Sequence, residues 1–359
     1  MTDGYVRYTD VIEAPDAGEA EVIDKIIATM QREGEITRKR YGKSVRTSHA
    51  KAHGLVEGEL HVFGDLPEPF RHGVFAEPKS FPVLTRLSHV PGEYLDDTKV
   101  STPRGMAIKI FGVDGPHLPG HEGETTQDFL LDTGTTFPSP GATAFLATIT
   151  ALEKATPAPE AVKQAMSATS RVTNAALNAV GLNSANLDFF GHPAFHPLAE
   201  AYYSQTPCRY GDYVAKIRAL PDTAKLHQMI GEKLDVGSDA NALRTAVTEF
   251  FRTNPAEYVI GVQLCTDLDR MPIEDASKEW PEDESPYHPV GRLALPIQDS
   301  AARVGLEDGL SFCLARCLAA HRPLGSINRA RLKAYGVMST LRRQQNGLSD
   351  VEPRTVAEL

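Results

Sequence analysis

Apolar positions along the chain follow two periodicities, and these separate predicted helices from predicted strands. Between Ala17 and Tyr41 the apolar residues recur at mostly helical spacing among charged ones, which indicates an amphipathic helix. Short β-branched or alternating segments, punctuated by Pro, Gly and Asp, predict strands at His49–Phe63, Val83–Val90, Met106–Val113, Asp128–Leu131, Tyr213–Leu220, Glu257–Leu264 and Val290–Leu295. Further helices are predicted at Ala142–Ala155, Pro159–Val180, Asn241–Thr253 and Ile327–Gln345.

The order of these elements predicts the fold class. Helices follow groups of strands instead of alternating with them, which favours α+β over a doubly wound sheet. So many strands separated by turns predict an antiparallel sheet closed into a β-barrel with surrounding helices. We expect one domain over residues 1–359, with a helical arm at 1–45, a barrel core at 46–300 and a second helical region at 301–346. The polar tail after Asn346 is predicted to be frayed.

Composition and charge restrict the partners. Of 359 residues, 41% are hydrophobic and 23% charged, which is typical of a globular protein with a sizeable core. A net charge of -10 disfavours nucleic acid and anionic membranes, so we expect a small-molecule partner. No run approaches the roughly 18 apolar residues of a membrane span. Residues 1–14 lack the apolar core of a secretory signal, and the four cysteines form no CxxC pair, so we expect a cytoplasmic location.

The predicted helix Ile327–Gln345 carries the most informative chemistry. At about 100° per residue, Arg331, Tyr335 and Arg342 lie at roughly 0°, 40° and 20° around the axis, on one side. A tyrosine binds ferric iron as the phenolate, which neighbouring guanidinium groups favour. A basic surface helix with a half-buried tyrosine has the same spacing. Spacing alone favours that second interpretation.

The stretch from Arg331 to Gly347 resembles the proximal helix of haem catalases, in which Arg and Tyr stand four apart and a second Arg follows seven later. The resemblance implies haem (iron protoporphyrin IX) as the cofactor and Tyr335 as the axial metal ligand, as in catalase haem. It also implies that Arg331 hydrogen-bonds Tyr335 and that Arg342 binds a haem propionate.

Two other stretches, Arg46-Thr-Ser-His49-Ala-Lys and Thr85-Arg86-Leu-Ser88, resemble the distal side of haem catalases. They imply that His49 moves the proton of a bound peroxide and that Ser88 fixes the tautomer of its imidazole. Arg46 and Arg86 are expected to bind propionates. A zinc pair of His49 with a histidine four residues later is disfavoured, because a strand separates such residues too far.

The chain also departs from typical catalases. An Asn assists the distal His in that family, and here Glu124 or Thr125 stands in the corresponding stretch, of which we assign Thr125 a catalytic role. Phe129 and Phe137 keep the spacing of two aromatic haem contacts. The residue before His49 is Ser48, which is expected to contact the cofactor and is polar where catalases have an apolar residue.

The motifs span Arg46 to Asn346 and leave no room for the long wrapping segment of large catalases, so the chain resembles the small catalase-related haem peroxidases, the minicatalases. That resemblance implies a peroxidase that reduces organic hydroperoxides through a ferryl intermediate, weakly dismutates hydrogen peroxide and uses a small-molecule electron donor. Ser48 and the altered Asn site keep a lipid hydroperoxide isomerase or lyase, similar to allene oxide synthase, as the alternative. A haem carrier and a colourless barrel that binds an apolar ligand are non-enzymatic interpretations. The Ala17–Tyr41 helix is interpreted either as a subunit contact of a homodimer or as a cover of its own barrel.

Overall fold

Antiparallel strands form the centre of the computed structural model, which describes residues 4–155, 191–349 and 352–359. The strands are β1 (Ala52–Val62), β2 (Ser80–His89), β3 (Arg104–Phe111), β4 (Thr126–Thr133), β5 (Tyr202–Tyr203), β6 (Cys208–Tyr210), β7 (Tyr213–Pro221), β8 (Ala256–Leu264) and β9 (His288–Leu295). They pair in the order β5-β4-β3-β2-β1-β9-β8-β7-β6, and β5 also pairs with β7. Because β5 joins β4 to β7, eight strands close into a barrel and β6 extends from β7.

The two faces of the strands differ in what they contact. Inward-facing residues such as Ile108, Ile110 and Phe129 belong to the core inside the barrel. On the outer face of β1 to β4, Leu55 and Leu84 pack under Phe312 in a smaller cluster. Alternation along a strand sends neighbouring side chains to opposite faces, so one sheet supplies both the core and a covered outer surface.

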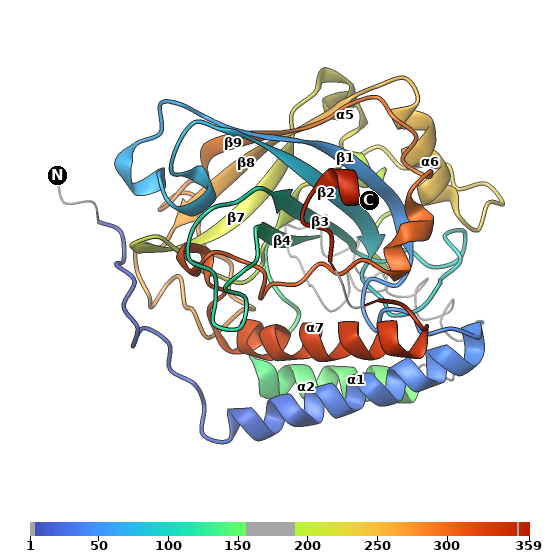
Figure 1. Ribbon diagram of the computed structural model, residues 1–359, viewed down its shortest axis with the longest axis horizontal. Helices are drawn as coiled ribbons and strands as arrows, with labels where there is room; N and C mark the ends of the chain where they lie inside the picture. Colours follow the sequence, from blue (N-terminus) through green and yellow to red (C-terminus); the bar gives the residue numbers. More distant parts are fainter. Residues whose placement is uncertain (1–3, 156–190, 350–351) are drawn as a thin grey trace.

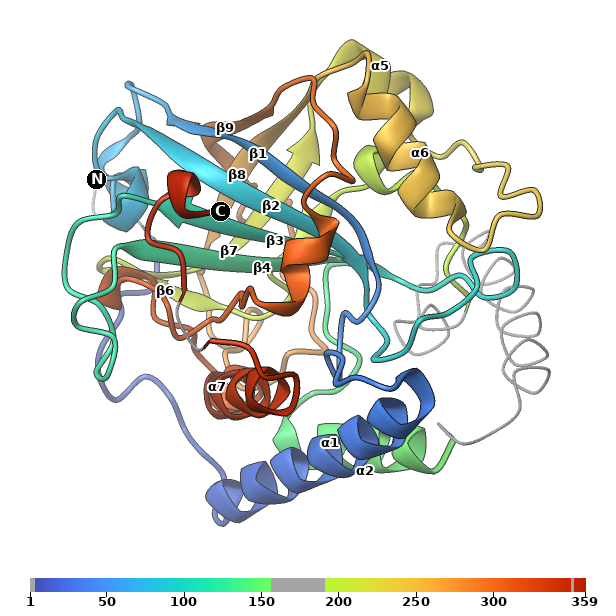
Figure 2. The same ribbon diagram turned by 45° about the vertical axis from the view of Figure 1, so that its right-hand side comes forward.

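Three helices form a layer beside the barrel: α1 (Glu19–Tyr41), α2 (Ala142–Ala155) and α7 (Ser326–Gln345) (Figure 1). Ile23, Ile26 and Ile27 of α1 pack against apolar residues of α2 and α7. α1 ends at Gly42, whose positive φ of 71° lets its N–H reach the carbonyl of Arg38 at 2.9 Å. The short helices α5 (Ala224–Met229) and α6 (Ala242–Phe251) cover another side of the barrel (Figure 2).

The predicted fold class, an antiparallel barrel with surrounding helices, is confirmed. The seven predicted strands and the helices corresponding to α1, α2, α6 and α7 all occur, with shifted ends. The two shortest strands, β5 and β6, were not predicted, because two or three residues carry no periodicity. The predicted helix Pro159–Val180 lies outside the described residues. Among the described residues, no helix is long and apolar enough to cross a membrane.

The prediction of a frayed C-terminal tail is wrong for its last residues. Val356 and Leu359 pack against the cluster on the outer face of the barrel, next to Phe312. The Glu352 carboxylate contacts the buried guanidinium of Arg343 and also pairs with Arg316 at 3.6 Å. Two apolar side chains and one carboxylate therefore hold the end of this tail against the rest of the chain, although the tail is mostly polar.

Candidate active site between the barrel and helix α7

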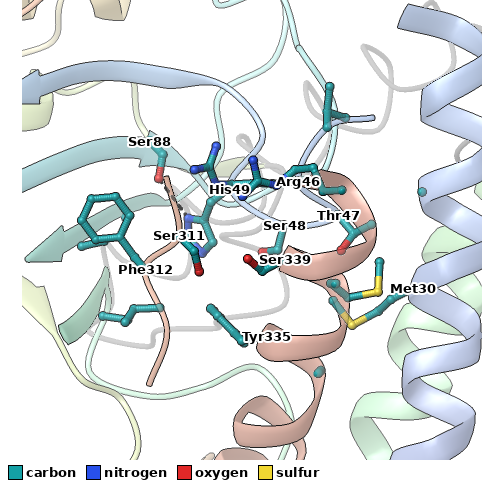
Figure 3. Close-up of a pocket in the computed structure, with 18 of the residues that line it drawn as sticks. Met30, Arg46, Thr47, Ser48, His49, Ser88, Ser311, Phe312, Tyr335 and Ser339 are labelled. Carbon is teal, nitrogen blue, oxygen red and sulfur yellow. Dashed lines mark hydrogen bonds between the residues drawn. The ribbon is translucent and has the colours of Figure 1, made fainter. Parts of the chain in front are cut away.

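A pocket lies between the outer face of the barrel and the helical layer. About 930 Å³ of empty space lies within it, a volume that includes the open solvent at its mouth. His49, Ser88 and Arg46 approach it from the barrel side and Tyr335 from α7 (Figure 3). Its apolar lining includes Met30, Val45, Met106, Ala107, Leu130, Leu131, Phe312, Ala334, Met338 and Leu341. The walls thus combine a large apolar surface with a few polar groups.

His49 is held by its backbone in a conformation that non-glycine residues rarely adopt. Its φ is 58°, in the left-handed region. The N–H of His49 donates to the carbonyl of Val90 at 2.7 Å, and its own carbonyl accepts from Arg86 at 2.8 Å. The ring nitrogen Nδ1 lies 3.1 Å from Oγ of Ser88. Such backbone conformations persist where the surroundings fix them, and they concentrate at functional sites.

The imidazole lies over a row of three residues in register across β2, β3 and β4. Ser88 pairs with Gly105, and Gly105 pairs with Asp132. A Cβ atom on Gly105 would lie 2.6 Å from Nδ1 of His49 and 3.0 Å from Oδ1 of Asp132. Only glycine leaves room for the ring at this place. Nε2 of His49 lies 3.5 Å from Oδ1 of Asp132, so the ring is between a hydroxyl and a carboxylate.

Burial shifts the acid–base properties of both groups. It lowers the pKa of His49 to about 3, and the nearby guanidinium groups of Arg86, Arg331 and Arg46 act in the same direction. Burial raises the pKa of Asp132 to about 6, although Arg331 opposes this shift. At neutral pH the site therefore holds an uncharged imidazole beside a carboxylate that takes up a proton in weak acid.

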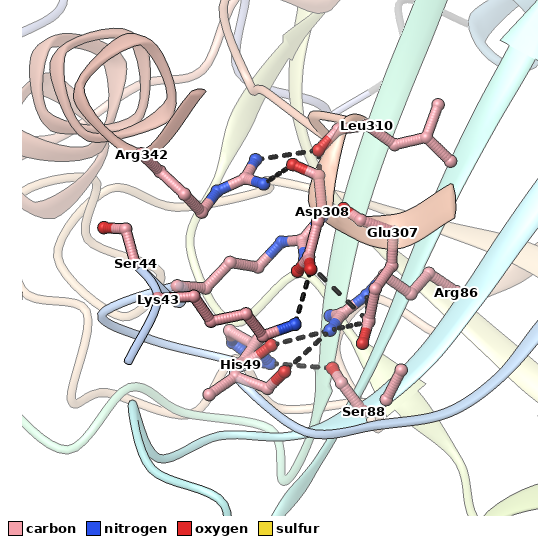
Figure 4. Close-up of polar contacts among 12 residues, drawn as sticks. Lys43, Ser44, His49, Arg86, Ser88, Glu307, Asp308, Leu310 and Arg342 are labelled. Atoms are coloured by element: carbon pink, nitrogen blue, oxygen red, sulfur yellow. Dashed lines mark hydrogen bonds and ion pairs between the residues drawn. The ribbon is translucent and has the colours of Figure 1, made fainter. Parts of the chain in front are cut away.

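Three arginines predicted to bind propionates converge at one edge of the pocket, where they hold a segment of the chain (Figure 4). Arg86 pairs with the Glu307 carboxylate at 2.8 Å. Arg46 donates to the carbonyls of Glu307 and Leu310 at 2.6 and 2.9 Å. Arg342 donates to the carbonyl of Leu310 at 2.8 Å and to that of residue 308. Burial and the other arginines lower the pKa of Arg342 to about 10.

On the other side of the pocket, Tyr335 projects from α7 (Figure 3). The guanidinium carbon of Arg331 lies 5.6 Å from the centroid of its ring, one helical turn away. Nη1 of Arg331 also approaches Oδ1 of Asn328 at 3.4 Å. Ser48 lines the pocket beside His49 and donates its hydroxyl to the Val90 carbonyl at 3.0 Å. The structure therefore brings together the predicted residues Arg46, Ser48, His49, Arg86, Ser88, Tyr335 and Arg342 around one pocket, with Arg331 adjoining it.

Three predicted site residues lie elsewhere. Thr125 precedes the far end of β4, seven residues from Asp132, or roughly 23 Å at about 3.3 Å per residue. Phe129 points into the barrel and lies 6.2 Å, between ring centroids, from Phe75. Phe137 packs edge-on against Phe145 of α2 at 5.3 Å. None of these three residues lines the pocket, and Leu130 and Asp132 of β4 do.

Other residues at the pocket were not predicted from sequence. Asp132 stands at the end of β4, whereas the resemblance to the catalase motif concerns the residues at the start of this strand. The alternation of side chains along β4 was a usable signal. Asp132 lies two residues after Leu130, so both side chains point to the same face of the strand, where Asp132 pairs with Gly105. Phe312 and the α1 residues Met30 and Gly34 carry no such signal, because tertiary packing alone brings them to the pocket.

Comparison with sequence-family models and with curated proteins gives no match. Solved structures do match. A bacterial catalase is 17% identical with a TM-score of 0.58, over 97% of this chain and 66% of that one. Catalase A from Saccharomyces cerevisiae is 17% identical with a TM-score of 0.60, over 96% and 68%. A fungal catalase is 16% identical with a TM-score of 0.59, over 97% and 66%. The chain spans about two thirds of the length of these proteins. It therefore has the catalase fold.

Proposed function

We propose that the chain is a haem-dependent peroxidase that reduces organic hydroperoxides and weakly dismutates hydrogen peroxide. The observation that carries the proposal is the placement of His49 and Tyr335 on one pocket, one from the barrel and one from α7 (Figure 3). An imidazole held at one nitrogen by Ser88 is suited to proton transfer. A tyrosine beside a guanidinium is suited to bind ferric iron.

The residues around the pocket fit a haem group. Apolar side chains from six different segments provide surfaces for a flat macrocycle. The buried Oδ1 atom of Asp132 is unpaired among the residues that the structure describes, so a polar group at the pocket remains available. Tyr335 would hold the iron, and the guanidinium of Arg331 lies over its ring. Haem, when bound, supplies the iron and the electrons that cleave the O–O bond.

The arginine cluster would hold the carboxylate end of the cofactor. Arg46 and Arg342 bind backbone carbonyls at residues 307 to 310. A guanidinium has five N–H groups in a fixed fork, so each arginine retains donors for a propionate. The same segment keeps Arg86 in an ion pair with Glu307. The cluster therefore combines a structural function with the capacity to bind a carboxylate.

The chain's own residues would move the substrate proton. His49 stands on the barrel side of the pocket, where it can receive the proton of a hydroperoxide and return it to the departing oxygen. The hydroxyl of Ser88 sets which ring nitrogen is protonated. The apolar walls near Phe312 and Leu130 favour a substrate with an organic group. The further partner would be a small-molecule electron donor, and the proposed location is the cytoplasm.

Steady-state assays with tert-butyl hydroperoxide and a dye donor test this proposal. The haem-loaded protein is expected to turn over much faster than the same concentration of free haemin, and to convert the hydroperoxide to the alcohol. An equal rate for protein and haemin would reject the proposal. A protein that fails to acquire a Soret band when mixed with haemin would reject haem binding itself.

A lipid hydroperoxide isomerase or lyase is the second candidate, favoured by the hydroxyl of Ser48 at the pocket. That hydroxyl donates to the carbonyl of Val90, so it is directed at the backbone. Product analysis separates the two activities. Donor-independent formation of epoxide-type products supports the isomerase, and an alcohol formed only with a donor supports the peroxidase.

The predicted subunit contact of α1 has a direct test of its own. The buried face of α1 packs against α2 and α7 of the same chain. Sedimentation of the purified protein gives the oligomeric state, and a homodimer would have to use another surface of this helix.

A further inference from the structure

Asp132 has a half-buried carboxyl group whose buried Oδ1 atom is directed at the distal imidazole. The row Ser88, Gly105 and Asp132 places a hydroxyl at Nδ1 of His49 and a carboxylate oxygen 3.5 Å from Nε2. Among the described residues, the Oδ1 atom of Asp132 has no hydrogen-bond donor. A buried polar atom without a partner costs free energy, so its persistence at a pocket indicates a functional reason. The nearest titratable partner is the imidazole.

The charges around the pair decide how it can take up a proton. The cationic groups facing His49 come from three segments, with Arg46 before β1, Arg86 on β2 and Arg331 on α7. Arg331 also faces Asp132. His89 on β2 and Tyr202 on β5 are the other titratable groups that interact with the two residues. A lone imidazole would become a cation among three guanidinium groups, and its pKa is accordingly lowered to about 3.

The nearby carboxylate of Asp132 makes proton uptake easier than it is for the imidazole alone. An ionised Asp132 beside a neutral His49 gives the pair a charge of minus one, and uptake of a proton makes the pair neutral. That change creates no new cation in a site already rich in arginine. Burial raises the pKa of Asp132 to about 6, so uptake by the pair is accessible near neutral pH. Two groups this close titrate as a unit and have shared macroscopic pKa values.

We propose that Asp132 and His49 act as one acid–base unit that holds the proton released by a hydroperoxide between Nε2 and Oδ1. This inference rests on the proposed function for the identity of the substrate. The proton leaves the hydroperoxide oxygen, is held by the pair, and returns to the oxygen that departs as the alcohol. The two electrons that cleave the O–O bond come from the haem and are restored by the donor. Asp132 is a positioning residue, because it acts through His49.

Nitrogen NMR of the haem-free full chain tests the unit without catalysis. With ¹⁵N-labelled histidine, the His49 ring signals are assigned by their loss in His49→Gln. We expect Nδ1, beside Ser88, to carry the proton above about pH 7, which leaves Nε2 free to share an added proton with Oδ1. Both ring signals should shift between pH 7 and 5, as the pair takes up that proton. In Asp132→Asn this shift is lost. Identical titration of His49 in the wild type and in Asp132→Asn would overturn the inference.

A matched control variant shows whether a changed His49 titration comes from the loss of the Asp132 carboxylate or from any Asp-to-Asn substitution in the chain. Asp283 is an exposed aspartate in the loop before β9, and Asp283→Asn is the same chemical change. Its His49 signals are expected to titrate as in the wild type. Thermal unfolding of both variants shows whether the chain is folded, and a folded Asp132→Asn variant with unaltered His49 signals counts against the proposal.

The haem-loaded protein supplies a second readout. Asp132→Asn is expected to lower turnover of tert-butyl hydroperoxide by roughly 10²-fold at pH 7, and to remove the acid limb of the pH profile between pH 5 and 7. If the wild type consumes no hydroperoxide but shows the coupled His49 titration, the proposed function fails and the unit stands. If the wild type is active and Asp132→Asn keeps the same pH profile and the same NMR titration, the unit fails and the proposed function stands.

Discussion

Gly105 lies directly beneath the ring of His49, so close that a Cβ atom on it would be 2.6 Å from Cε1 and Nδ1 of the imidazole. The neighbouring strands place Ser88 on one side of this glycine and Asp132 on the other. The position of the imidazole is therefore set by the absence of a single side chain at the centre of the row. The positions of both groups that flank the ring, the Ser88 hydroxyl and the Asp132 carboxylate, depend on that space.

Substitution of Gly105 by alanine is expected to displace the imidazole from its two partners. Contacts below 3.0 Å require movement, and here the ring is the group that must move. General acid–base catalysis contributes about 10²- to 10⁴-fold, and we expect a loss of that order in hydroperoxide turnover. Gly336→Ala is the control, because Gly336 is exposed on α7 with open space around it. Equal activity of the two variants would contradict the placement of His49.

Substitutions on the two sides of the pocket are expected to affect different properties, namely turnover for His49 and haem retention for Tyr335. His49→Ala should reduce peroxide turnover by about 10²- to 10⁴-fold while the haem spectrum remains, because the proposed role of the imidazole is to move protons and not to bind the iron. Tyr335→Phe should weaken haem retention, measured by the Soret absorbance after gel filtration. The reverse pattern would mean that the roles of the two residues are exchanged.

Glu307→Gln is expected to destabilise the protein. The carboxylate pairs with Arg86 at 2.8 Å, and both side chains are buried, with 9% and 3% exposure. Removal of one partner of a buried ion pair leaves an uncompensated charge and costs about 3–5 kcal/mol. Urea unfolding of the haem-free chain measures the free energy of unfolding. Glu232→Gln, an exposed site, serves as the control, and equal midpoints for the two variants would show that the pair contributes nothing.

Asp132→Asn is expected to stabilise the haem-free protein at pH 7.5. The pKa of Asp132 is about 6 in the folded chain against an ordinary value of 3.8 for an aspartate, so the folded state binds the proton more tightly than the unfolded state. Stability is therefore highest below about pH 4 and decreases as the pH rises through 6. The gain from the substitution is on the order of 3 kcal/mol above pH 7 and should vanish near pH 4. Unfolding measured at several pH values, with Asp283→Asn as the reference, checks the sign.

Periodicity predicted the barrel strands and the long helices, because each buries one face over eight or more residues. It could not predict β5 and β6, which are two and three residues long and exist through pairing with β7. The barrel closes through β5, which pairs with both β4 and β7. The number of predicted strands made closure expected, but no pattern in the sequence indicated which residues close the barrel.

The sequence was most informative where short motifs fix local geometry. Arg86 and Ser88 lie two residues apart on β2, and Arg46 and His49 lie just before β1, the strand that pairs with β2. The resemblance to the catalase motif did not extend reliably along β4, where a shift of one residue changes which face a side chain occupies. Phe129 was assigned to the site although its neighbour Leu130 faces the pocket, and Thr125 was assigned to it although the strand places Asp132, seven residues later, beside His49. Phe312 and Met30 reach the pocket through packing of distant segments, which leaves no local pattern.

One wall of the pocket comes from α1, whose Met30 and Gly34 face the same space as His49. This helix packs on α2 and α7 through apolar side chains and contributes no strand to the barrel. Outward tilting of α1 would widen the pocket without breaking the strand ladder, so entry of the proposed tetrapyrrole would depend on the helical layer and not on the barrel.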